Sequence, residues 1–220
     1  MKKCLKVALV LMAAIALVVC SILGTLAYLR SNDSVTNTFT VGKVGITLDE
    51  APVNEYGEVV AGDRVDGNTY KLIPGHTYVK DPTVTVTDGS EESYIRMIVK
   101  ITDYADVKTV FGNDFLPQNF VQGWDPAVWV TTNVIGTENN GDTAVYEFRY
   151  FETVDTLNNQ PLELDALFDS FEIPDGISND NLAKLAEMKI IVEAHAIQAD
   201  GFNGNEDDAW TAFDQEMANN

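Results

Sequence analysis

The 220-residue chain contains two histidines, His76 and His195. Glu193 lies two residues before His195, so on a β-strand both side chains would share one face and could supply two zinc ligands. A hydrolytic zinc site needs about three protein ligands and an activating base, and the sequence has no H-E-x-x-H motif. We therefore interpret Glu193 and His195 as polar residues on the outer face of a strand. His76 follows Pro74-Gly75 and is interpreted as a solvated turn residue.

A second candidate for chemistry is the run 200–208, DGFNGNEDD, which is dense in the oxygen ligands that calcium prefers. Its glycines do not match an EF-hand loop, and a helical pattern follows it. We expect Asn203 or Asn205 to cap that helix, with Asp207 and Asp208 interacting favourably with its dipole. Calcium binding is the alternative role for the run 200–208. No G-x-S-x-G elbow is present either, so the sequence predicts no catalytic residue and a protein that is not an enzyme.

Composition narrows the class of protein. The chain is 45% hydrophobic and 10% aromatic, which is typical of one folded domain with a sizeable core. It carries 14 Lys+Arg against 34 Asp+Glu, a formal charge of −20. This excess of acid argues against nucleic acid as a partner, because phosphate recognition needs a basic surface. Strong negative charge favours solubility and repulsion between copies.

The N-terminus has the pattern of an export signal. A basic region, Lys2, Lys3 and Lys6, precedes an apolar run at 7–26. This pattern predicts a signal peptide over residues 1–27, with cleavage between Ala27 and Tyr28 after a stretch of small residues. A permanent membrane anchor is the alternative, since about 20 apolar residues also suffice to span a bilayer.

Cleavage at this position would change the mature chain in two ways. Cys4 and Cys20 would leave with the signal peptide, so the exported protein would have no disulfide and no thiolate metal site. Loss of three lysines would take the formal charge from −20 to −23. The prediction is a secreted protein stabilised by packing and by backbone hydrogen bonds.

The segment 28–48 has the alternation of a strand-like arm. Before Gly42 its apolar residues fall on odd positions, namely Leu29, Val35, Phe39 and Val41. Beyond Gly42 the apolar residues fall on even positions, which predicts a β-bulge there. Residues 49–220 are expected to form the main domain, beginning with a loop or loose hairpin over 49–68.

The pattern of the rest of the chain predicts strands joined by turns. Strands are expected near 78–87, 94–101, 128–135, 143–154, 164–173 and 188–198. Helical patterns occur at 104–110, 181–187 and 206–217, the last with Trp210, Phe213 and Met217 at helical spacing. In the strand at 94–101, Ile95, Met97, Val99 and Ile101 share one face, so it should be half-buried. No helix is long enough for a parallel crossover, so the chain is predicted to be an all-β antiparallel sandwich with short helices at its periphery and one at its C-terminus.

Several blocks of sequence together resemble one family. They are GTLAYL at 24–29, NTFTVGKVGITL at 37–48, PGHT with KDPTV at 74–84, SYIR at 93–96, LFDS with IP at 167–174, and EAHAIQADGF at 193–202. These blocks resemble the TasA/camelysin family, whose members are exported with a signal peptide that a SipW-type signal peptidase removes. The similarity spans nearly the whole chain, and it is specific only when the N-terminal and C-terminal blocks are taken together.

The resemblance implies a jelly-roll-like β-sandwich, exported by Gram-positive cells, that assembles into fibres of the biofilm matrix. It also implies that residues 28–41 are donated as a strand to a neighbouring copy, with other copies, the SipW-type peptidase and an accessory matrix protein as partners. Camelysin-type members are described as zinc metallo-endopeptidases on the cell surface, which gives the alternative function, with Glu193 and His195 as the metal candidates.

The arm suits this role on physical grounds as well. An alternating segment at a chain end can complete an exposed sheet edge through backbone hydrogen bonds, while alternate side chains fill apolar slots. Burying Leu29, Val35, Phe39 and Val41 would contribute on the order of 6–10 kcal/mol before ordering costs. The alternatives are that the arm pairs within its own domain, or that the protein is a monomeric adhesin or ligand-binding module.

Overall fold

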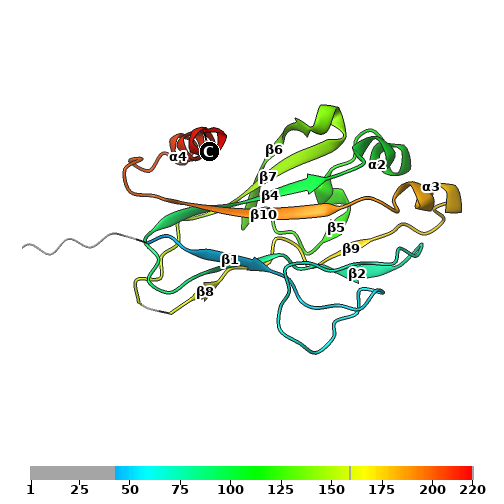
Figure 1. Ribbon diagram of the computed structural model, residues 1–220, viewed down its shortest axis with the longest axis horizontal. Coiled ribbons are helices and arrows are strands. Elements are labelled where there is room, and N and C mark those ends of the chain that lie inside the picture. The colour runs from blue at the N-terminus through cyan, green and yellow to red at the C-terminus, as the bar shows by residue number, and fades with distance from the viewer. Residues whose placement is uncertain (1–42, 159, 220) are drawn as a thin grey trace, which may run out of the picture. The chain divides into compact units, whose positions relative to one another are not determined.

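Ten strands in three antiparallel sheets form the framework of the structure, a computed structural model that describes residues 43–158 and 160–219 (Figure 1). The largest sheet has the order β10-β4-β7-β6. Its strands are β4 (Ser93–Ile101), β6 (Trp129–Glu138), β7 (Thr143–Tyr150) and β10 (Ile190–Gln198). The β-rich antiparallel fold predicted from the sequence is confirmed.

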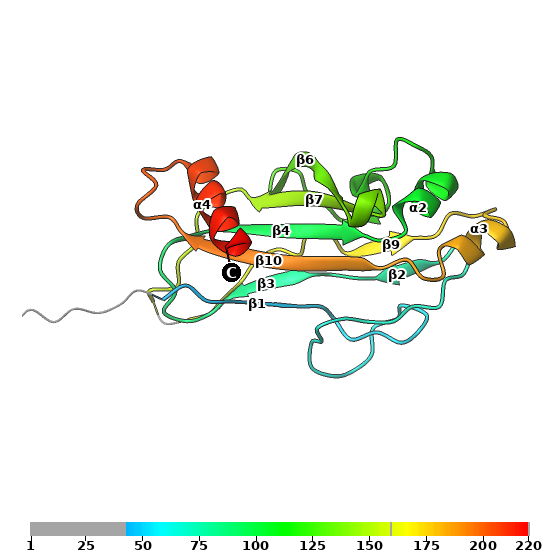
Figure 2. The same ribbon diagram turned by 45° about the horizontal axis from the view of Figure 1, so that its top comes forward.

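Two smaller sheets form the opposite layer (Figure 2). One has the order β1-β3-β8, with β1 (Ile46–Asp49), β3 (Thr83–Val86) and β8 (Leu162–Glu163). The other has the order β2-β9-β5, with β2 (Thr77–Val79), β9 (Ser170–Glu172) and β5 (Val121–Gln122). All strand pairs are antiparallel, as the absence of a long crossover helix predicts.

Backbone hydrogen bonds join the two smaller sheets into one layer. The N–H of Leu167 donates to Pro82 O at 3.0 Å, and the N–H of Lys80 donates to Asp169 O at 3.1 Å. The strand predicted over 78–87 is therefore present but interrupted between β2 and β3. The prediction of one strand over 164–173 was wrong for most of its length, since β8 ends before this range, the strand is interrupted, and only β9 lies inside it. Pro82 lies between β2 and β3 and has no N–H to donate, which accounts for one of these interruptions.

The helices lie close to their predicted positions. They are α2 (Tyr104–Phe111), α3 (Asn179–Lys184) and α4 (Glu206–Ala218), with short 3-10 turns at η1 (Pro117–Asn119) and η2 (Asn139–Gly141). Asn205 caps α4, and its side chain accepts from the N–H of Asp208 at 3.4 Å. Of the two predicted caps, Asn205 is confirmed.

The core lies between the two layers. The predicted inward face of β4 is confirmed, since Ile95, Met97, Val99 and Ile101 are all buried. They meet aromatic side chains from both layers, including Trp129, Tyr146, Phe148, Tyr78 and Phe171. The other face of β4 is also covered, with Arg96 and Ile98 only 4% and 5% exposed. The prediction of a half-buried strand was therefore wrong for this face.

The described residues cover only the end of the predicted arm. Within 28–48, residues 46–48 belong to β1 and pair with β3. The loose hairpin predicted over 49–68 is present, with bridges from Glu50 to Val65 and from Val53 to Val59. The predicted signal peptide 1–27, its cleavage site Ala27–Tyr28, and the arm residues Leu29, Val35, Phe39 and Val41 lie outside the described residues. Among the residues described, no helix has the length and apolarity needed to cross a bilayer.

Candidate functional site

Strand β10 forms a long and regular edge of the four-stranded sheet. It pairs with β4 over nine residues, from Ile190 opposite Ile101 to Gln198 opposite Ser93, without a shift in register. The other edge of this sheet, β6, shifts register between Thr131 and Val134 and again before Gly136. Bulges of this kind protect an edge against pairing with another chain, whereas a flat, regular edge invites it.

The outward backbone groups of β10 can be identified from its pairing. The N–H of Thr102 donates to Lys189 O at 3.1 Å, and the N–H of Ala199 donates to Glu92 O at 2.8 Å. Because bonded residues alternate along an antiparallel pair, odd-numbered residues of β10 bond to β4 and even-numbered ones point their N–H and C=O away from it. These outward residues are Ile190, Val192, Ala194, Ala196 and Gln198. Within 43–158 and 160–219, no backbone partner bonds to them.

Strand β1 runs beside β10 in the opposite layer and also has a free edge (Figure 1). The N–H of Thr87 donates to Gly45 O at 2.9 Å, so by the same alternation Ile46 and Leu48 direct their backbone groups away from β3. No backbone hydrogen bond between described residues joins β1 to β10. The two layers therefore meet here in a seam with two unpaired strand edges.

A groove follows this seam at the start of β10. It consists of two adjoining hollows of about 410 and 210 Å³ that share Asn68, Lys80, Ile190 and Ile191. The walls of the larger hollow are part polar and part apolar, and their apolar side chains include Tyr70, Leu72, Phe171, Leu185 and Met188. An extended segment that paired with β10 could place apolar side chains in these hollows.

A buried ion pair lies where the two hollows meet. Lys80 Nζ is 2.8 Å from Glu50 Oε2, and the two side chains are only 9% and 5% exposed. Tyr70 lies close by and donates its hydroxyl to Val79 O at 3.0 Å. Burial raises the pKa of Tyr70, and the negative charge of Glu50 raises it further. The groove thus has a buried, mutually neutralised ion pair at the point where its two hollows meet.

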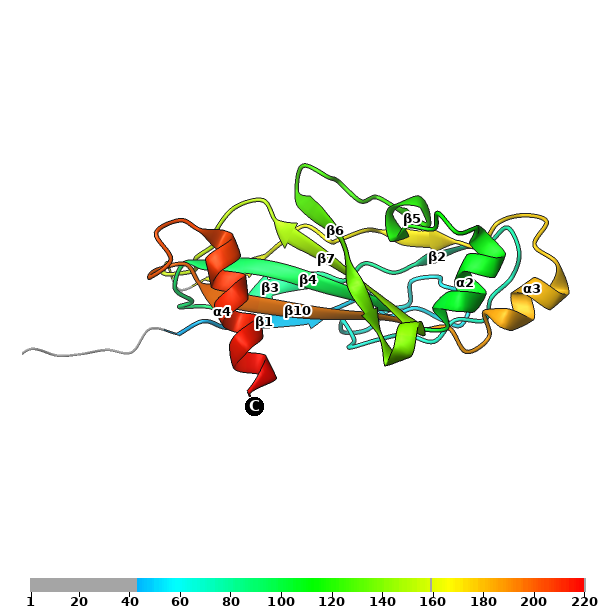
Figure 3. The same ribbon diagram turned by 90° about the horizontal axis from the view of Figure 1, so that it is seen from above.

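Helix α4 covers the outer face of the four-stranded sheet next to this edge (Figure 3). Its attachment centres on Arg96 of β4, whose guanidinium lies 4.4 Å from the ring centroid of Trp210 and 5.1 Å from that of Phe213. The same guanidinium donates to both carboxylate oxygens of Asp214. A buried cation is thereby paired and stacked at once, which fixes the position of the helix.

The predicted metal candidates lie on this outer face but make different contacts. His195 is half-buried under α4, where its Nδ1 accepts from Arg96 Nε at 3.1 Å and its ring stacks on Phe213. The carboxylate of Glu193 binds Lys100 at 3.0 Å. Burial lowers the pKa of His195, and the charge of Arg96 lowers it further. The shared face of the two residues is confirmed, but His195 is not the exposed residue that the sequence predicted.

His76 also differs from its predicted role as a solvated residue. It is partly buried, its Nε2–H donates to Tyr56 O at 2.6 Å, and its ring packs edge-on against Tyr78. His76 therefore ties the hairpin at 49–68 to β2. Among the residues that the structure describes, no three His, Cys, Asp or Glu side chains come together as a metal site.

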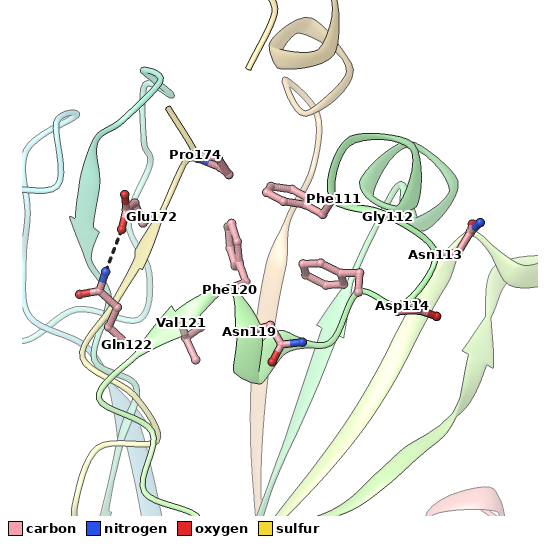
Figure 4. Close-up of a pocket in the computed structure, with 11 residues that line it drawn as sticks. Phe111, Gly112, Asn113, Asp114, Asn119, Phe120, Val121, Gln122, Glu172 and Pro174 are labelled. Atoms are coloured by element: carbon pink, nitrogen blue, oxygen red, sulfur yellow. Dashed lines mark hydrogen bonds between the residues drawn. The ribbon is translucent and has the colours of Figure 1, made fainter. Parts of the chain in front are cut away.

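A separate cavity of about 490 Å³ lies between α2 and the short edge strand β5 (Figure 4). Three phenylalanines, Phe111, Phe115 and Phe120, pack against one another at its floor. Gln122 donates to Glu172 at 3.0 Å at its rim. This cavity could not be predicted from the sequence, because residues 103–127 lack regular periodicity apart from the short helix.

Sequence reasoning also missed the role of Arg96. The alternation in β4 placed it on the outer face, and the spacing of Trp210 and Phe213 indicated an amphipathic helix, but neither pattern shows that the two meet. Comparisons with protein-family models, with curated proteins and with solved structures find no match to the chain.

Proposed function

We propose that the protein is a secreted structural protein that assembles into extracellular fibres by passing an N-terminal strand to the next copy. The observation that carries this proposal is the regular, unpaired edge of β10 beside a groove whose walls include apolar side chains. A sheet edge of this kind is a template for an added strand. In this proposal, the edge of β10 and the groove form the acceptor half of the strand exchange.

Residues 28–41 would supply the donated strand. If this segment paired with β10, Leu29, Val35, Phe39 and Val41 would point into the sandwich, and the polar even-numbered residues would point outward. A subunit that gives its own strand and accepts another makes a head-to-tail contact, which propagates rather than closing by symmetry. A groove that exists before binding lowers the cost of association.

We also propose that the sandwich is a jelly roll. If β2 with β3 and β8 with β9 are each counted as one strand, the residues that the structure describes form eight strands, four in each layer. In a jelly roll the second strand pairs with the seventh and the third with the sixth, and the same pairings occur here as β3-β8 with β2-β9, and as β4-β7. The first and last strands, β1 and β10, lie side by side at the seam.

In this proposal, removal of residues 1–27 by a SipW-type peptidase starts assembly, because an arm held in a membrane cannot reach a neighbour. The protein would then lie in the extracellular matrix or at the cell surface of a Gram-positive cell, with other copies and an accessory matrix protein as partners. The resemblance to the TasA/camelysin family supports this setting. The alternative of a zinc endopeptidase gains no support from Glu193 and His195, whose side chains are held by Lys100 and Arg96.

Deletion of the arm tests the proposal. Purified protein starting at Tyr28 should form filaments visible by electron microscopy, and protein lacking residues 28–41 should stay monomeric in light scattering. A variant with Leu29 and Phe39 changed to Asp keeps the arm length but removes its apolar side chains, and it should also stay monomeric. Filaments that persist without residues 28–41 would overturn the proposed mechanism.

A further inference from the structure

The C-terminal helix extends further than the sheet that it covers. Its first turn lies over β7, where Arg149 binds Asp207 at 2.6 Å. Its middle lies over β4, where Arg96 stacks on Trp210, and the next contact is with β10, where His195 stacks on Phe213. The helix therefore crosses the strands in the order β7, β4, β10, and its last residues pass beyond the free edge of the sheet (Figure 3).

The spacing of these contacts predicts which residues of α4 would lie over a further strand added outside β10. Neighbouring strands lie about 4.8 Å apart, and an α-helix rises about 1.5 Å per residue, so one strand corresponds to about three residues of helix. Asp207, Trp210 and Phe213 follow this interval. The next position, over a strand that would lie outside β10, falls at about residues 216–217.

Met217 occupies this position. It continues the apolar stripe of Trp210 and Phe213, yet its side chain is 61% exposed, whereas that of Trp210 is 2% exposed. All residues from 214 to 219 are exposed. The stripe thus ends in an apolar side chain that the described residues of a single subunit leave exposed.

We propose that the end of α4 closes over the strand that β10 receives from a second copy, with Met217 packed on the outer face of that strand. This inference rests on the proposed function, and it names the part of the acceptor that retains the donated strand. The occupant is the segment 28–41 of another copy.

Charge supports this choice of occupant. Five of the thirteen residues of α4 are acidic and none is basic. When the odd-numbered apolar residues of the arm point into the sandwich, the even-numbered ones face α4, and these include Tyr28 and Arg30. Arg30 is the single cationic residue of the segment 28–41. Three of the acidic residues lie in the first turn of α4 and Asp214 binds Arg96, so the charge near Met217 comes from Glu216 and from the negative end of the helix dipole. This charge would favour the arm over other extended segments of this acidic chain.

Disulfide cross-linking tests the contact. The mature chain has no cysteine once residues 1–27 are removed, so introduced cysteines report single contacts. Copies with Met217→Cys would be mixed with copies that carry one arm cysteine, at Tyr28, Arg30 or Asn32, then assembled and oxidised. We expect disulfide-linked dimers on non-reducing gels for at least one of the three positions.

Gln215→Cys is the matched control, because it lies on nearly the opposite side of the same helical turn and should give no dimer. If filaments depend on the arm but Met217→Cys cross-links to none of the three positions, the proposed contact between α4 and the donated strand is wrong and the proposed function stands. If filaments form without the arm, both the proposed function and the proposed contact of α4 with the donated strand are wrong.

Dissociation of subunits gives a second readout. Met217→Asp should leave filament formation intact but increase the rate of subunit loss after dilution on the order of tenfold, because a buried apolar contact mainly slows dissociation. Gln215→Asp adds the same charge to the same turn and should dissociate as the unmodified protein does. Equal rates for the two variants would overturn the inference.

Discussion

The guanidinium of Arg96 is stacked 4.4 Å from the ring centroid of Trp210, and it joins the middle strand of the four-stranded sheet to the C-terminal helix. Both side chains are almost fully buried, with 4% and 2% exposure. Stacking, the bond to Asp214 and the approach of Glu147 at 3.7 Å together compensate the buried charge. The position of α4 therefore depends on very few residues.

Replacing Trp210 by alanine should weaken the fold strongly. The change removes a buried aromatic side chain and the stacking partner of Arg96, so we expect a loss of about 3–5 kcal/mol in the free energy of unfolding. Urea unfolding of unassembled subunits measures it. Met217→Ala in the same helix should cost less than about 0.5 kcal/mol, because its side chain is exposed in the single subunit. Similar losses for both variants would contradict the docking of α4 through Trp210.

The stability of the subunit should fall in mild acid because of His195. The groups around its ring are Arg96 and Lys100 on β4, Glu193 on β10 and Asp214 on α4. Burial and Arg96 lower the pKa of His195 in the folded state below its ordinary value of 6.5. The unfolded chain then binds the proton more readily, so this contribution is fully present above about pH 6.5 and is lost as the pH falls through the lower folded pKa.

Unfolding measured from pH 7.5 to pH 5 checks this expectation. His195→Asn keeps a polar side chain near Arg96 but cannot titrate, so the part of the pH dependence that comes from His195 should disappear. His76→Gln removes the other imidazole and should retain that part. An unchanged pH profile in His195→Asn would show that the buried imidazole does not contribute.

A proline at the edge of β10 should block assembly without unfolding the subunit. The N–H of Ala194 points away from β4, so Ala194→Pro removes no bond within the sheet but deletes a donor that an added strand would use. Glu163→Pro is the matched control, because by the same alternation Glu163 lies outward at the edge of β8. Only the first variant should lose filaments, while both keep the circular dichroism spectrum of the unmodified subunit. Filaments from Ala194→Pro would exclude this edge as the acceptor.

Removing one partner of the ion pair in the groove should lower the stability of the subunit strongly, whereas replacing both partners by apolar residues should lower it much less. Lys80→Met leaves the carboxylate of Glu50 buried without its partner, which typically costs about 3–5 kcal/mol. The double variant Lys80→Met with Glu50→Leu removes both charges and should recover most of this loss. Thermal unfolding of the three proteins provides the comparison. A double variant as unstable as Lys80→Met would indicate that the pair has a role beyond mutual neutralisation.

Period-two and helical patterns predicted much of the fold correctly. The inward residues of β4, the cap at Asn205 and the three helices follow from local rules of spacing and capping, which depend only on neighbouring residues. The same rules failed where strands are short. Residues 164–173 alternate in part, yet most of that segment crosses the layer as irregular backbone held by single hydrogen bonds.

For the candidate site, the sequence by itself determined the acidic charge and the apolar stripe on the last helix, and it predicts a leader and an alternating arm. Only the tertiary structure decided which strand is a free edge, which hollows lie along it, and that Arg96 receives Trp210 and Asp214 from a helix more than 100 residues away. Strand order and side-chain contacts depend on residues distant in the chain, because they are set by how the layers fold over one another, and no local spacing encodes them.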